Sequence, residues 1–239
     1  MSPLRLDDLD LWRAAFEVRY ANAYRIWDEI GGGWAEMVAA FPKLKMNQAE
    51  PGKTLFRLDQ AVEVSVELGK LAVVAATPPT PLQEFTELSE AITRITSKRL
   101  SIGEYTRVGL RLIFVKEMSD RKSASEAVIS TGMIAAPVGQ QFGVSGEGLF
   151  PEYSIRKEDG KKGYSVRLKA EELTFELDLP IEWRGVAEPV SRKPLRVSFD
   201  VDFYTIGVVT TGQFNVTQWI SQAAHVIRRD SDTFLRGAA

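Results

Sequence analysis

The stretch YTRVGLRLIFV, residues 105–115, is the starting point for interpreting the whole chain, because its continuous apolar run predicts a central β-strand. Side chains of a strand alternate between the two faces of a sheet. One face of this strand is apolar, and the other carries Tyr105, Arg107, Gly109 and Arg111. The two arginines lie about 13 Å apart at about 3.3 Å rise per residue. Two permanent charges beside a glycine predict either a ligand site or a salt-bridged surface.

Composition excludes several classes of protein. The 239 residues are 44% hydrophobic and 26% charged, which is typical of a globular protein and not of a disordered one. Thirty basic and 32 acidic residues give a net charge of -2, so nucleic-acid binding is not indicated. There is no cysteine, and the single histidine, His225, falls on the solvent side of its predicted helix. Thiolate chemistry is excluded, and a histidine-dependent site is disfavoured.

The sequence gives no indication of a membrane segment. The first residues, MSPLRLDD, lack the apolar stretch that follows the charge of a signal peptide. The longest apolar run, Leu71 to Ala76, is far shorter than the roughly 20 residues of a membrane-spanning helix. We therefore expect a cytoplasmic protein without a membrane partner.

The first 120 residues predict a βαββαβ, ferredoxin-like half with helices on one face of an antiparallel sheet. A helix between Asn22 and Pro42 is expected to break or kink at Gly31-Gly32-Gly33, because each glycine weakens a helix by about 1 kcal/mol. The predicted strands are 11–20, 55–58, 61–68, 71–76 and 105–115, and a second helix is predicted to end near residue 100.

Residues 121–239 predict a β-meander followed by a C-terminal helix, packed with the first half as one compact α+β unit. A long loop at 135–151, rich in glycine and proline, is the best internal boundary. Strands are predicted at 153–157, 164–169, 173–179 and 195–204, and the last helix is predicted to begin at the N-cap Asn215.

Charged residues on the predicted strands form the candidate site. The first strand carries Arg13, Glu17 and Arg19 on its polar face, and a late strand carries Asp200 and Asp202. We expect Arg107, Arg111, Tyr105, Arg19 and Glu17 to bind a ligand. Asp200 and Asp202, about 6–7 Å apart, either hold a divalent cation such as Mg²⁺ or Mn²⁺ or pair with the arginines. Asp230 of the last helix is a further expected partner of Arg107 or Arg111.

Three of these segments together resemble a known family. Residues 16–19 (FEVR), 105–111 (YTRVGLR) and 199–203 (FDVDF), followed by an amphipathic helix, are similar to a sporadically distributed prokaryotic family without a settled activity. The resemblance covers nearly the whole chain. The patchy distribution of this family implies an accessory or defence-type role.

Two functions from different classes follow from these observations. The first is a non-enzymatic binding protein without a cofactor, with a protein as the expected partner, such as a component of a defence or toxin-antitoxin-type system. The alternative is a metal-dependent hydrolase of nucleotides or nucleic acid, in which Asp200 and Asp202 hold Mg²⁺ or Mn²⁺ and Arg107 or Arg111 binds phosphate. A structural homo-oligomer is a third possibility.

Overall fold

The computed structural model describes most of the chain, namely residues 4–50, 52–58, 61–78, 82–134, 149–173, 175–176, 191–192 and 194–237. For residues 175–176 and 191–192 only the backbone is described. Most of the loop predicted at 135–151 and of the strand predicted at 173–179 lies outside the described residues.

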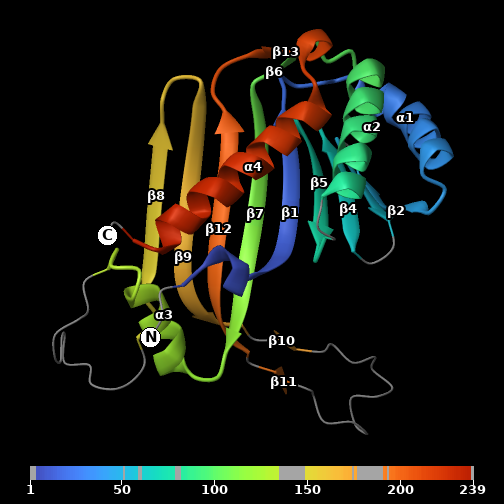
Figure 1. Ribbon diagram of the computed structural model, residues 1–239. Helices are drawn as coiled ribbons and strands as arrows, with labels where there is room; N and C mark the ends of the chain where they lie inside the picture. The colour runs from blue at the N-terminus through green and yellow to red at the C-terminus, as the bar shows by residue number, and fades with distance from the viewer. Residues whose placement is uncertain are drawn as a thin grey trace, which may run out of the picture.

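The fold is built on one antiparallel sheet of nine strands in the order β2-β3-β4-β5-β1-β7-β12-β9-β8 (Figure 1). These strands are β1 (Asp10–Arg19), β2 (Leu44–Glu50), β3 (Lys53–Leu58), β4 (Val62–Glu67), β5 (Lys70–Ala76), β7 (Arg107–Met118), β8 (Glu152–Glu158), β9 (Lys162–Glu172) and β12 (Leu195–Thr205). Two small two-stranded sheets add β6 (Glu104–Tyr105) with β13 (Val209–Thr210), and β10 (Phe175–Glu176) with β11 (Ser191–Arg192).

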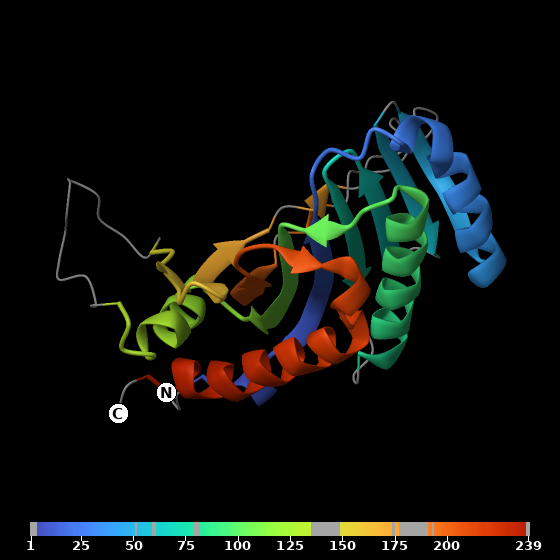
Figure 2. The same cartoon turned by 90° about the horizontal axis from the view of Figure 1, so that it is seen from above.

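The helices of the described part of the chain all lie on one face of this sheet (Figure 2). They are α1 (Ile26–Ala40), α2 (Gln83–Arg99), α3 (Arg121–Ile129) and α4 (Val216–Leu235), with short 3₁₀ turns at Leu6–Asp8 and Thr211–Gln213. The prediction of an α+β protein with an antiparallel sheet and helices on one face is therefore confirmed.

The hydrophobic core lies between the sheet and the helices. Alternate residues of the central strands are buried on this side, among them Phe16, Leu110 and Phe199, and Ile220 of α4 packs in the same cluster. Helix α4 begins where Asn215 accepts a hydrogen bond from the Gln218 amide at 2.8 Å, as the capping pattern predicted. Burial of one apolar face of each strand explains why the polar face of the same strands is left for other roles.

Four strands lie between α1 and α2, where three strand ranges were predicted and the βαββαβ order has two, so that order is incomplete. The additional edge strand β2 was missed because every residue after Leu44 in it is exposed. An edge strand without buried positions has no apolar alternation from which it could be predicted. The ferredoxin-like description of the first half stays a prediction.

Helix α1 continues through Gly31, Gly32 and Gly33, so the predicted break is wrong. A Cβ on Gly32 would lie 3.2 Å from Nη1 of Arg99 in α2, and Gly33 also faces Arg99. Arg99 in turn forms ion pairs with Glu29 and Glu36 of α1. Contacts between the two helices therefore stabilise a segment that has a low helix propensity of its own.

The two halves of the sequence contribute to the same sheet. Strand β7 pairs with β1 on one side and with β12 on the other, from Leu195 opposite Met118 to Tyr204 opposite Gly109. The junction of the halves is thus at the centre of the sheet. Among the described helices, none has the length and apolar character needed to cross a membrane.

Candidate functional site

The polar face of the sheet brings together the charged residues of β1, β7 and β12, and we call this set the charged face. Strand register sets the arrangement, since Arg19 lies opposite Arg107, and Arg111 lies opposite Asp202. This face is turned away from the helices and from the viewer in Figure 1. The charged face consists of Arg13, Glu17, Arg19, Arg107, Arg111, Asp200 and Asp202.

Arg107 is the centre of an ion-pair network across three strands. Its Nη1 donates to Glu17 Oε1 at 3.1 Å, and its Nη2 donates to Asp202 Oδ2 at 2.7 Å. Glu17 Oε1 also accepts from Arg19 Nε at 2.7 Å. Arg107 is only 21% exposed, so these bonds are partly shielded from water. The predicted grouping of Glu17, Arg19 and Arg107 is present.

Arg111 forms a separate, two-pronged pair with Asp200. Nε of Arg111 donates to Oδ1 of Asp200 at 2.8 Å, and Nη2 donates to Oδ2. This hydrogen bonding is the largest influence on Arg111 and raises the pKa of its guanidinium. A bidentate pair fixes the plane of the guanidinium, so Arg111 is held in one orientation.

Tyr204 and Gly163, which were not predicted from the sequence, complete the site together with Gly109. The guanidinium of Arg107 lies over the Tyr204 ring at 4.6 Å, in a cation–π contact. A Cβ on Gly109 would lie 2.7 Å from Nη1 of Arg107, and a Cβ on Gly163 would lie 2.6 Å from the Tyr204 ring. The glycines therefore make room for these two side chains. The sequence signal was Gly109 itself, two residues from each arginine on the same face.

Asp202 is a partly buried carboxylate of the network. Burial is the largest influence and raises the pKa of the Asp202 carboxyl, although the Arg107 and Arg111 guanidinium groups act in the opposite direction. The ionised form of Asp202 therefore depends on its arginine partners.

Two of the three paired arginines, Arg19 and Arg111, are more exposed than the carboxylates that they bind, whereas Arg107 is slightly less exposed than its partners. The side chain of Arg111 is 50% exposed, and that of its partner Asp200 is 13% exposed. For Arg19 and Glu17 the values are 55% and 24%. Arg13 is exposed and forms no ion pair with a described residue. Although its charges are nearly balanced in number, the charged face therefore presents mainly cationic groups to solvent.

A groove of about 470 Å³ runs over this face. Six basic and four acidic side chains line it, together with Gly109 and apolar residues of β3, β5 and β7. Its basic residues are Arg13, Arg19, Lys53, Lys70, Arg107 and Arg111.

Tyr105 does not belong to the charged face, so its predicted orientation is wrong. Its hydroxyl is 2.7 Å from Ser97 Oγ of α2, and its ring makes an edge contact with Phe214. The strand is interrupted at Thr106, and Tyr105 belongs to the small sheet with β13. The interruption breaks the alternation that would have placed Tyr105 beside Arg107. Burial raises the pKa of its hydroxyl.

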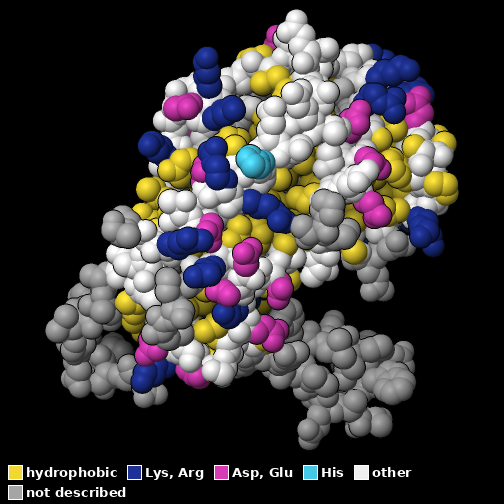
Figure 3. All heavy atoms as spheres, in the orientation of Figure 1, with side chains coloured by type: hydrophobic (Ala, Val, Ile, Leu, Met, Phe, Trp, Pro, Cys, Tyr) yellow, Lys and Arg dark blue, Asp and Glu magenta, His cyan; other side chains and the backbone are white. Residues whose placement is uncertain are grey.

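Two residues of α4 also lie away from the charged face. Asp230 was expected to meet Arg107 or Arg111, but α4 covers the opposite face of the sheet, and Asp230 pairs with the adjacent Arg229. His225 is exposed, as its helical phase predicted, and is visible as the cyan side chain in Figure 3.

The arginine pairs bear on the metal hypothesis for Asp200 and Asp202. Asp200 accepts two hydrogen bonds from Arg111, and Asp202 accepts one from Arg107. A divalent cation would have to replace these bonds to reach both carboxylates. Within the described part of the chain, no group of three or more histidine, aspartate or glutamate side chains is arranged to hold a metal ion. The geometry favours the predicted ion pairing over metal coordination.

Comparison with known proteins adds no family or function to this description. No protein-family model matches the chain, and no curated protein matches it significantly. The resemblance to the sporadically distributed prokaryotic family stays a prediction.

Proposed function

We propose that this chain is a non-enzymatic binding protein, and that its charged face binds acidic side chains of a partner protein. The proposal rests on the difference in solvent exposure between the arginine and the carboxylate in two of the ion pairs. Arg19 and Arg111 extend toward solvent, while Glu17 and Asp200 lie beneath them. An approaching partner therefore meets guanidinium groups first.

The arginines are positioned before a partner arrives, which favours binding. A free arginine side chain loses conformational entropy when it is immobilised in an interface, at a cost of about 0.5–1.5 kcal/mol. Arg107 and Arg111 are already held by Asp202 and Asp200. Each guanidinium has five N–H donors, so donors remain for a carboxylate of the partner.

Arg13 provides a cation without a competing partner. It lies opposite Ile113 at the end of the groove, and no described carboxylate pairs with it. An acidic side chain of a partner would gain a new ion pair there without breaking one. The accessory or defence role that the family resemblance implies is compatible with this proposal and rests on the resemblance alone.

A titration of two matched double variants tests the proposal. The probe is a fluorescein-labelled decaglutamate peptide at low salt, followed by fluorescence anisotropy. The test variant, Arg13→Ala with Arg19→Ala, removes two exposed charges of the charged face. The control, Arg94→Ala with Arg228→Ala, removes two exposed charges from the helix side and leaves the same net charge.

We expect the test variant to bind the peptide roughly 2- to 30-fold more weakly, from about 0.2–1 kcal/mol for each exposed ion pair. The control variant should bind like the unmodified protein. An equal loss of peptide affinity in both variants would show that binding depends only on the net charge of the protein and would contradict the proposal.

The same proteins separate the other functions. If a labelled DNA oligonucleotide binds more tightly than the peptide and depends on Arg13 and Arg19, the partner is a nucleic acid. If the protein hydrolyses a nucleotide with Mg²⁺ or Mn²⁺ and Asp202→Ala abolishes that activity, the hydrolase alternative holds. If a mass measurement in solution shows an oligomer that Arg13→Ala dissociates, the partner is a second copy of the chain.

A further inference from the structure

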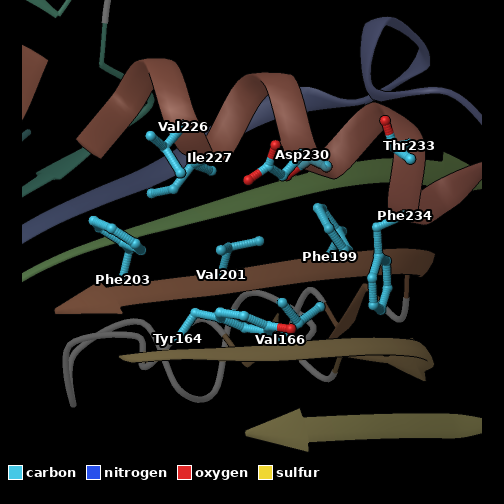
Figure 4. Close-up of a pocket in the computed structure, with 11 residues that line it drawn as sticks. Tyr164, Val166, Phe199, Val201, Phe203, Val226, Ile227, Asp230, Thr233 and Phe234 are labelled. Atoms are coloured by element: carbon cyan, nitrogen blue, oxygen red, sulfur yellow. The ribbon is translucent and has the colours of Figure 1, made fainter. Parts of the chain in front are cut away.

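A second hollow lies on the opposite side of the sheet, between the C-terminal half of α4 and strands β9 and β12 (Figure 4). Its volume is about 350 Å³. Side chains of both layers point into it, with Val226 and Ile227 from the helix and Val201 and Tyr164 from the strands. This volume falls within the range of about 300–1,000 Å³ that is usual for small-molecule sites.

Aromatic rings form much of the wall. Phe199 and Phe234 lie 5.7 Å apart between ring centroids, and Phe203 and Tyr164 line the same hollow. Phe203, Tyr164 and Phe234 are partly exposed although they belong to the layer between helix and sheet. These rings would lose contact with water if a planar apolar molecule filled the space.

Three hydroxyl groups line the hollow without a hydrogen-bond partner among the described residues, those of Tyr164, Ser231 and Thr233, and Ser231 is the most buried of them. Ser231 is 4% exposed, lines the hollow and makes no side-chain hydrogen bond with the described residues. Of the buried hydroxyls of α2, those of Thr86, Ser89 and Thr93 each donate to the carbonyl four residues earlier, and that of Thr96 has no partner. The Ser231 oxygen is not fully enclosed, so water reaches it from the hollow, and the donor of a ligand could replace that water.

We propose that this hollow, here called the α4 pocket, binds a neutral, mainly aromatic small molecule that carries one N–H or O–H group. The rings take up its apolar part, and its donor is placed against Ser231. Asp230, the charged residue among the described residues of the wall, is paired with Arg229, so a neutral ligand meets no unpaired charge there. The inference is independent of the proposed function, because the α4 pocket and the charged face lie on opposite sides of the sheet.

A fluorescence titration tests the α4 pocket. The probe is N-phenyl-1-naphthylamine, a neutral molecule with one N–H whose emission increases in apolar surroundings. Its partner probe, 1-phenylnaphthalene, has similar rings and no N–H. We expect saturable binding of one N-phenyl-1-naphthylamine per chain.

Two variants and one control locate the site. Val226→Trp adds a large side chain at the pocket wall and should abolish saturable binding. His225→Trp adds the same side chain at the adjacent exposed position and should leave binding unchanged. Ser231→Ala keeps the space and removes the hydroxyl, so N-phenyl-1-naphthylamine should bind roughly three- to tenfold more weakly while 1-phenylnaphthalene is unaffected.

The proposal is overturned if the unmodified protein shows no saturable binding, or if Val226→Trp binds the probe as well as His225→Trp does. Thermal melting establishes that each variant is folded. Should Val226→Trp not fold, Ser231→Ala decides, because equal effects on both probes would show that the hydroxyl does not contact the ligand.

Discussion

Replacing Gly163 with alanine tests whether the glycine exists to make room for Tyr204. In the structure, a Cβ on Gly163 would lie 2.6 Å from Cε2 and Cζ of Tyr204 and 2.8 Å from its hydroxyl oxygen. Tyr204 cannot move away freely, because it is buried, contacts Arg107 and hydrogen-bonds Glu158 at 2.8 Å. The added methyl group must therefore displace a ring that is held on several sides.

The size of the effect follows from two opposing contributions. Overpacking a filled site costs typically 1–3 kcal/mol. Exchanging glycine for alanine also restricts the unfolded chain, which offsets about 0.4–1 kcal/mol. We therefore expect Gly163→Ala to lower the free energy of unfolding by about 0.5–2 kcal/mol. For a chain of this length, that corresponds to a fall in Tm of about 1–8 °C.

Thermal melting followed by circular dichroism measures this change, with Gly103→Ala as the control. No atom lies within 4 Å of a Cβ at Gly103, and its φ is not in the left-handed region. The control should melt at or slightly above the temperature of the unmodified protein. Equal Tm values for the two variants would contradict the explanation.

A double-mutant cycle makes the test specific to the ring. In a Tyr204→Ala background the space above Gly163 is empty, so Gly163→Ala should no longer cost stability. The interaction energy between the two positions should be at least about 0.5 kcal/mol, as for residues in direct contact. If Gly163→Ala costs the same in both backgrounds, the glycine has a different role.

Three further changes give measurable outcomes. Arg107→Ala should lower the free energy of unfolding by about 1–3 kcal/mol in urea denaturation, because it leaves the partly shielded Asp202 without a charged partner and removes one of the two ion pairs of Glu17. The side chain of Arg111 is more exposed than that of Arg107, so Arg111→Ala should cost about 1 kcal/mol or less, and equal losses would be inconsistent with this difference in exposure. Asn215→Ala should cost about 0.5–2 kcal/mol in the same assay, because it removes the N-cap of α4. Hydrogen bonds from Ser119 and Ser123 lower the pKa of Asp120 to about 2, so its contribution to stability is present above the ordinary pKa of 3.8 and lost as the pH falls toward 2. Asp120→Asn, which retains a capping group, should reduce the pH dependence of the urea midpoint in that range. An unchanged pH dependence would argue against this role of Asp120.

The sequence predicted much of the charged face because one simple regularity, the alternation of side chains, holds along its strands. Alternation placed Arg107 and Arg111 on one face, and the same rule placed Asp200 and Asp202 together. Both arginine pairs are present in the structure. Which arginine binds which aspartate depends on the register of β7 against β12. The alternation of side chains within one strand does not specify how that strand is aligned with its neighbour in the sheet.

Other features depended on tertiary contacts that leave no local pattern. Tyr105 follows the alternation in sequence, yet the break at Thr106 turns it toward α2. The glycines of α1 predict a break, yet Arg99 of another helix fits against them. Strand β2 is recognised only by its pairing with β3. In each case a distant segment determines the conformation.

The position of β7 between β1 and β12 also has a consequence for how the chain folds during synthesis. Leu110 of β7 lies opposite Phe16 and Phe203, which are 94 and 93 positions away in the sequence. At a synthesis rate of about 5–20 residues per second, β12 is synthesised about 5–20 s after β7. During this interval an apolar strand has an unpaired edge, which promotes aggregation. We therefore expect chains truncated before residue 195 to aggregate, and synthesis pauses between β7 and β12 to lower the yield of folded protein.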